Sequence, residues 1–130
     1  MRLKILAGIL MAASWPALAQ QTIQVGTPTN MFTPMNVTIQ AGQTVTFQNV
    51  AGFHNVTSGA GAVTTFRCGP NGCDGVGGGN GEPGGGTWSQ TVTFPTVGNV
   101  PFFCEVHGQS MSGVIQVNPV PVTLQSFDID

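Results

Sequence analysis

Apolar and polar residues alternate along several short runs of the chain, and a period of two is typical of half-buried β-strands. Between Asn36 and Gln40, for example, Val37 and Ile39 fall on one face and the polar residues on the other. The runs with this pattern are 22–26, 35–40, 44–48, 53–57, 88–94, 100–104 and 113–117. Because apolar residues do not recur at helical spacing for more than a turn, the pattern predicts an all-β sandwich or barrel of about seven to eight strands.

The alternation is lost between Ser58 and Gly86. Ten of the eighteen residues from Gly69 to Gly86 are glycine. A phosphate-binding loop would need a Gly-Lys-Ser/Thr sequence and a change from strand to helix, and neither follows. We therefore expect residues 69–86 to form a long, mobile surface loop.

The first nineteen residues have the composition of a secretory signal. Arg2 and Lys4 precede an apolar run from Ile5 to Ala13, and Ala17-Leu18-Ala19 matches the A-x-A cleavage pattern. The apolar run is shorter than the ~20 residues that cross a bilayer, so we expect no membrane insertion. Cleavage near Ala19 would leave a periplasmic or secreted protein. The predicted division is a signal peptide at 1–19, one domain at 20–118 and a C-terminal tail at 119–130.

Charge excludes one large class of functions. After residue 19 the only Lys or Arg is Arg67, whereas the acidic residues are Asp74, Glu82, Glu105, Asp128 and Asp130. A single basic side chain cannot neutralise a run of phosphates, so nucleic-acid binding is excluded. We expect any partner to be recognised through apolar and neutral polar surface.

The chain has three cysteines, and an odd number leaves one thiol over in an oxidising compartment. Cys68 and Cys73 flank the turn-forming sequence Gly-Pro-Asn-Gly and could form a disulfide. Cys104 would then remain free, although a bond from Cys104 to either of the others is an alternative. A free exported thiol needs protection, by burial or by a metal.

A metal is the better explanation because Cys104 is followed closely by two other donors, His107 and Met111. The only other histidine is His54, between two strand-like runs. Thiolate, imidazole and thioether donors favour copper over magnesium or calcium, and two histidines, a cysteine and a weak axial methionine form an electron-transfer copper site. Each residue alone has a commoner interpretation, such as a core histidine, a structural thiol or a core methionine. Together they predict one copper ion bound by His54, Cys104, His107 and Met111.

The arrangement resembles the cupredoxins, the family of plastocyanin, azurin, pseudoazurin and amicyanin. The resemblance covers most of the chain after residue 19. The segments that carry it are Phe32-Thr33-Pro34, Val37-Thr38-Ile39, Gly42-Gln43-Thr44-Val45, His54-Asn55-Val56, and Cys104-x-x-His107 followed by Met111-x-Gly113. Three residues separate His107 from Met111, where plastocyanin-like proteins have four and amicyanin-like ones two.

The resemblance implies a Greek-key fold in which His54, Cys104 and His107 are equatorial copper ligands and Met111 is axial. It also implies that Asn55 ties to the loop bearing Cys104. By the same resemblance, the protein is a soluble, monomeric one-electron carrier whose redox partner proteins dock at the His107 edge, and it is not an enzyme.

Other functions of copper proteins fit the sequence less well than an electron carrier. A copper nitrite reductase needs further histidines, and a binuclear copper centre needs another cysteine near Cys104. A periplasmic copper chaperone or resistance protein is the main alternative, although such proteins tend to use exposed methionine-rich or histidine-rich segments. An adhesion or signalling module that has lost its metal is the third possibility, and the intact ligand set argues against it.

Overall fold

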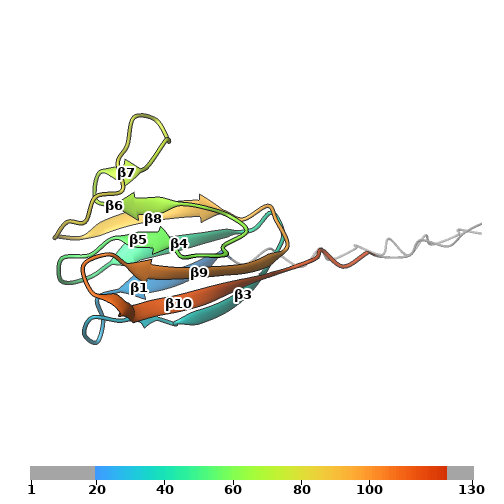
Figure 1. The fold of residues 1–130 in the computed structure, drawn as a ribbon, viewed down its shortest axis with the longest axis horizontal. Coiled ribbons are helices and arrows are strands. Elements are labelled where there is room, and N and C mark those ends of the chain that lie inside the picture. Colours follow the sequence, from blue (N-terminus) through green and yellow to red (C-terminus); the bar gives the residue numbers. More distant parts are fainter. Residues whose placement is uncertain (1–19, 123–130) are drawn as a thin grey trace, which may run out of the picture.

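Residues 20–122 are described by the structure, a computed structural model, and they form ten β-strands in two facing sheets (Figure 1). The predicted signal peptide and the last eight residues of the predicted tail lie outside this range. In chain order the strands are β1 (Gln21–Val25), β2 (Phe32–Thr33), β3 (Asn36–Gln40), β4 (Thr44–Asn49), β5 (Val56–Ser58), β6 (Arg67–Gly69), β7 (Gly72–Cys73), β8 (Trp88–Thr93), β9 (Gly98–Cys104) and β10 (Gly108–Asn118). The predicted all-β sandwich is confirmed.

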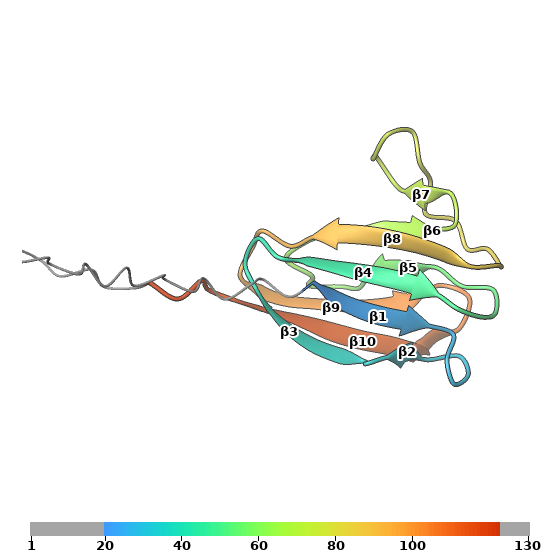
Figure 2. The ribbon, with the colours of Figure 1, turned by 180° about the vertical axis from the view of Figure 1, so that it is seen from behind.

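The strands are ordered β2-β1-β4-β8 in one sheet and β3-β10-β9-β5-β6-β7 in the other. Two pairings are parallel, β1 with β4 and β3 with β10, and the remaining strand pairs are antiparallel. Strands β1 and β3 are close in sequence but belong to different sheets, so the chain crosses from one layer to the other within residues 21–40. Figure 2 shows the sheet of β1, β4 and β8 in front of the other.

The alternating runs of the sequence become alternating burial in the strands. In β9 the side chains of Val100, Phe102 and Cys104 point into the core, as the sequence predicts. Phe102 meets Phe47 of the opposite sheet edge-on at a centroid distance of 5.5 Å. Each such buried side chain contributes about 1.5–3 kcal/mol. The core therefore holds the last residue of β9, Cys104, in a fixed position.

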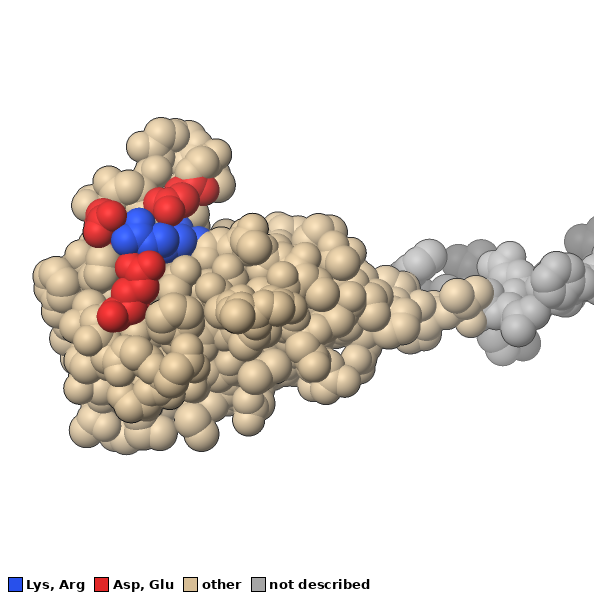
Figure 3. Space-filling model, viewed as in Figure 1, with Lys and Arg blue, Asp and Glu red and all other residues tan. Residues whose placement is uncertain are grey.

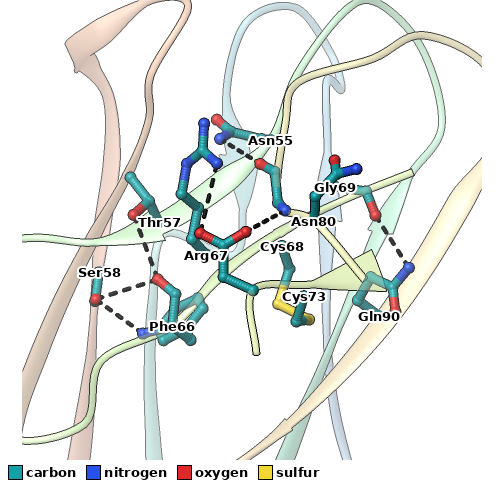
Figure 4. Close-up of a disulfide and its surroundings, with 12 residues drawn as sticks. Asn55, Thr57, Ser58, Phe66, Arg67, Cys68, Gly69, Cys73, Asn80 and Gln90 are labelled. Atoms are coloured by element: carbon teal, nitrogen blue, oxygen red, sulfur yellow. Dashed lines mark hydrogen bonds and ion pairs between the residues drawn. A yellow bond between two sulfur atoms is a disulfide. The ribbon is translucent and has the colours of Figure 1, made fainter. Parts of the chain in front are cut away.

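The segment from residue 67 to 86 differs from the sequence prediction. Instead of one long surface loop over 69–86, it begins with the hairpin of β6 and β7. The predicted disulfide between Cys68 and Cys73 closes this hairpin. Gln90 of β8, a polar break in an otherwise apolar face, donates a hydrogen bond to the Gly69 carbonyl at 3.0 Å. Figure 4 shows this contact beside the disulfide. The alternation is lost here because the bonds that order the segment are non-local.

Strand β5 also begins later than expected. It starts at Val56, and His54 makes only an isolated bridge to Gly84. Within residues 20–122, no helix is long and apolar enough to cross a membrane.

Candidate metal centre

Four connections gather at one end of the sandwich, on the left in Figure 1, and residues 20 and 122 lie toward the other end. These connections are β1–β2, β4–β5, β7–β8 and β9–β10. His54 lies in the β4–β5 connection, and Cys104 is the last residue of β9. His107 closes the short turn before β10. The fold thus brings together residues that the sequence places fifty positions apart.

The three predicted equatorial ligands meet around one point. The Cys104 Sγ atom lies 3.7 Å from Nδ1 of His54 and 3.7 Å from Nδ1 of His107. The donor atoms all lie within 4.8 Å of one another. The two imidazole rings are tilted by 47° with centroids 4.9 Å apart. Each histidine therefore presents its Nδ1 atom to a space that it shares with the thiol.

Burial and charge favour the metal-binding forms of these groups. His54 and Cys104 are fully buried, whereas His107 is partly exposed. Burial lowers the pKa of His54, the neighbouring His107 lowers it further, and a hydrogen bond to the Ala51 carbonyl opposes the shift. The lowered pKa favours the neutral ring of His54, which is the form that binds metals.

Two glycines make room for the far side of the His54 ring. Gly52 has a φ of 82°, and a Cβ atom added there would lie 2.5 Å from Nε2 of His54. Gly26, with a φ of 83°, approaches the same nitrogen and the Ala51 carbonyl. Both positions need glycine because backbone and ring come close where L side chains are strained. From the sequence, Gly52 was expected only among the residues around His107, and neither glycine was expected to contact the His54 ring.

Met111 is buried in β10 at an irregularity beside Cys104. Gly108 pairs with Cys104 and Ser112 pairs with Phe103, so residues 109–111 are an insertion in the β9–β10 ladder. A bulge of this kind redirects side chains locally. Met111 thus follows the Cys104–His107 turn within the irregular part of the ladder.

Asn55 joins the two ligand-bearing segments. It is fully buried, and its Oδ1 atom accepts a hydrogen bond from the backbone N–H of Glu105 at 3.0 Å. Its Nδ2 group donates to the Gly81 carbonyl and to Oε2 of Glu105, both at 3.0 Å. The tie between Asn55 and the cysteine-bearing loop, implied by the family resemblance, is therefore present in the structure.

The sequence analysis missed the partners of Glu105. Glu105 lies between the two predicted ligands Cys104 and His107 and forms an ion pair with Arg67, at 2.8 Å from Nε to Oε1. The Arg67 guanidinium lowers the pKa of Glu105, Asn55 contributes in the same direction, and partial burial opposes them. In Figure 3 the one blue side chain lies among the red ones. One feature of the sequence could have pointed to this ion pair: Arg67 is the only Lys or Arg after position 19.

The glycine-rich segment contacts the site directly. The N–H of His54 donates to the Gly84 carbonyl and the N–H of Gly84 donates to the His54 carbonyl, both at 3.1 Å. The buried side chain of Asn49 donates to the carbonyls of Gly52 and Gly86. Residues 81–86 therefore support His54 and Asn55 from one side.

The donor set fits copper. A buried thiol that is free while the other two cysteines are paired, together with two imidazole nitrogens, offers soft and borderline donors in one enclosed space. Magnesium and calcium would need oxygen ligands, and the charged carboxylates of the described residues, on Asp74, Glu82 and Glu105, all pair with Arg67 instead.

Comparisons with known proteins agree with this chemistry. Residues 19–118 match the family described as copper binding proteins, plastocyanin/azurin family. The chloroplastic plastocyanin of Oryza sativa subsp. indica is 39% identical over 93 residues, which cover 68% of this chain and 55% of the plastocyanin. This chain thus spans about half the length of that relative.

Solved structures give the same fold. Amicyanin from Paracoccus versutus has a TM-score of 0.52 and 23% identity, with 82% of this chain and 87% of amicyanin covered. A purple cupredoxin from Nitrosopumilus maritimus has a TM-score of 0.55 and 20% identity, with 76% of this chain and 100% of that chain covered. With the family match extending over most of the chain, the protein belongs to the plastocyanin/azurin family of copper-binding proteins.

Proposed function

We propose that this protein is a one-electron carrier that uses a single type 1 copper ion bound by His54, Cys104, His107 and Met111. The observation that carries the proposal is the convergence of Cys104 Sγ and the two histidine Nδ1 atoms within 4.8 Å, in a buried space. Copper held by such a set gains and loses one electron by cycling between Cu(II) and Cu(I). The irregularity at residues 109–111 supports Met111 as the weak fourth ligand.

The chain contributes rigidity. The core fixes Cys104, the two hydrogen bonds with Gly84 hold the backbone of His54, and Asn55 ties their two segments together. A site whose ligands are fixed by hydrogen bonds and packing reorganises little when the charge of the ion changes. Little reorganisation is what a carrier needs and what a protein that releases its metal does not need. Burial of His54, Cys104 and Met111 likewise supports the carrier over a copper chaperone.

We infer that redox partner proteins dock where His107 reaches the surface. His107 is the only one of the four proposed ligands with appreciable exposure. Its neighbour Val106 is 47% exposed, and Phe53, next to His54, is 56% exposed. Exposed apolar side chains of this kind suit a transient, largely uncharged interface. Catalysis is not part of the proposal, since both histidines of the chain belong to this one site.

Export through the signal peptide at 1–19 completes the proposal, with a mature domain that ends near residue 118. The Cys68–Cys73 disulfide supports an oxidising compartment such as the periplasm.

Titration of the metal-free protein with Cu(II) tests the proposed function. We expect an intense visible thiolate-to-copper band that saturates at one ion per chain, and a reversible one-electron wave in voltammetry. Cys104→Ser should remove the band because a hydroxyl is a poor copper ligand. Tight Cu(I) binding without a reversible wave would instead indicate a chaperone.

A further inference from the structure

Arg67 is the centre of the charge network of the described residues. Residues 20–122 contain four side chains of Lys, Arg, Asp or Glu, and the three carboxylates all lie around the Arg67 guanidinium. Nη2 of Arg67 is 3.1 Å from Glu82 Oε1, and Nη1 is 3.5 Å from Asp74 Oδ2. The contact with Glu105 is closer than either. The network is therefore organised by a single cation rather than spread over the surface.

The contact between Arg67 and Glu105 is bidentate. Nε donates to Oε1 at 2.8 Å and Nη2 donates to Oε2 at 2.9 Å. The side chains are only 25% and 33% exposed, whereas that of Glu82 is 65% exposed. Two parallel hydrogen bonds fix the carboxylate in both position and angle, which a lysine could not do. Arg67 thus determines where the Glu105 carboxylate lies.

Glu105 in turn bonds to the residue that ties the ligand segments together. Its Oε2 atom accepts from Asn55 Nδ2 as well as from Arg67, and its N–H donates to Asn55 Oδ1. The backbone of Glu105 directly follows Cys104. A chain of hydrogen bonds therefore runs from Arg67 through Glu105 and Asn55 to the Cys104–His107 turn.

Strand pairing and the adjacent disulfide hold the backbone of Arg67 in place. Its backbone pairs with Thr57 of β5, and its carbonyl accepts from the N–H of Asp74 at 2.9 Å. The next residue, Cys68, is buried and bonded to Cys73. Figure 4 shows Arg67 beside the disulfide and on the same side as Asn55. The β6–β7 hairpin can therefore act as a fixed support.

We propose that Arg67 is a positioning residue for the copper-ligand turn at residues 104–107, acting through the Glu105 carboxylate. The proposal deepens the proposed electron-carrier function and rests on it. It gives the disulfide hairpin and the only cation of the mature chain a role in the metal centre. Arg67 touches none of the four proposed ligands in this role.

A double-mutant cycle on the metal-free protein tests the route through Glu105. Arg67→Met should speed hydrogen exchange of the amide at position 105 by about tenfold, because the Asn55–Glu105 pair loses its support. In a Glu105→Ala background the same Arg67→Met change should alter that exchange by less than about twofold. Equal acceleration in both backgrounds, or in neither, would overturn the proposal.

Glu82→Gln is the matched control. It removes an ion pair of Arg67 but leaves the contact with Glu105, so the amide at position 105 should keep its exchange rate within about twofold. If Glu82→Gln reproduces the effect of Arg67→Met, Arg67 acts by fixing the glycine-rich segment and not the ligand turn. Should Arg67→Met fail to fold, Arg67→Lys replaces it, since it keeps the charge and loses the bidentate fork.

The copper-loaded protein supplies a readout that simple stabilisation would not move. We expect Arg67→Met to slow electron self-exchange at least about threefold, because looser ligands reorganise more, with no change for Glu82→Gln. An unchanged rate would contradict the proposal. If the wild-type protein binds no copper, the proposed function fails, and the exchange cycle on the metal-free chain still decides whether Arg67 holds the turn.

Discussion

The thiol of Cys104 lies 3.7 Å from Nδ1 of His54, although the two residues are fifty positions apart in the chain. His54 reaches this position from a connection held to the glycine-rich segment, and Cys104 from the end of a core strand. Because His54 lies outside the named strands, its backbone is held by two hydrogen bonds with Gly84.

Replacing Met111 tests the fourth ligand. Met111→Leu should retain the visible band, because the thiolate that produces it remains. Loss of the weak thioether donor should favour Cu(I) and raise the reduction potential by about 60 mV, equivalent to about tenfold in the Cu(I)/Cu(II) ratio. Voltammetry measures the shift, and Met35→Leu, at a methionine that is 47% exposed, is the control. A colourless Met111→Leu protein would show a larger role for this residue.

Asn55→Ala should strongly destabilise the fold. The substitution leaves the N–H of Glu105 and the carbonyl of Gly81 without their partner in a buried region. Unmade buried hydrogen bonds of this kind cost about 2–4 kcal/mol in the free energy of unfolding. Denaturant unfolding of the metal-free protein measures the loss. Asn36→Ala, at an exposed position, should change stability by less than about 0.5 kcal/mol.

Gly52 and Gly61 form a matched pair that separates backbone strain from crowding of the ligand. Their φ angles are 82° and 81°, so alanine costs about 1–2 kcal/mol of stability at either position. Only at Gly52 would the new Cβ meet the His54 ring; at Gly61 nothing lies within 4 Å. Gly52→Ala should therefore weaken copper binding by about tenfold or more, and Gly61→Ala should not. If competition titration gives the two variants equal affinities for copper, the crowding argument is contradicted.

Removing the disulfide tests the support given by the hairpin. A Cys68→Ala, Cys73→Ala double variant should lose about 2 kcal/mol of stability, since the closed ring is short. The amides of His54 and Gly84 should then exchange faster, because their mutual bonds depend on the position of the glycine-rich segment. Amide exchange followed by NMR measures both. If the amides of His54 and Gly84 exchange as slowly in the double variant as in the wild-type protein, residues 81–86 are ordered without the disulfide.

Alternation of apolar and polar residues predicted most of the fold but little of the region around the disulfide. Alternation at Val37 and Ile39, or at Val100 and Phe102, reports directly on burial in strands, and these predictions are confirmed. Strands β6 and β7 have no alternation because their order comes from a disulfide and from contacts with residues such as Gln90. Such contacts leave no local period in the sequence.

The same distinction applies to the metal centre. Residue type and spacing alone predicted the donors, because the third cysteine lies close to His107 and Met111 and the chain has one other histidine. The assignment of all four ligands stays a prediction, with three brought together by the fold. The ion pair of Arg67 with Glu105 and the close approach of Gly52 to the His54 ring could not be predicted, because both contacts are set by tertiary structure.

Diffraction from copper-loaded crystals at the copper absorption edge tests the central claim most directly. We expect one anomalous peak, at bonding distance from Cys104 Sγ and from the Nδ1 atoms of His54 and His107, with Met111 on the same ion. A peak elsewhere, for instance among the carboxylates around Arg67, or a Cys104 bonded to another sulfur, would contradict the account.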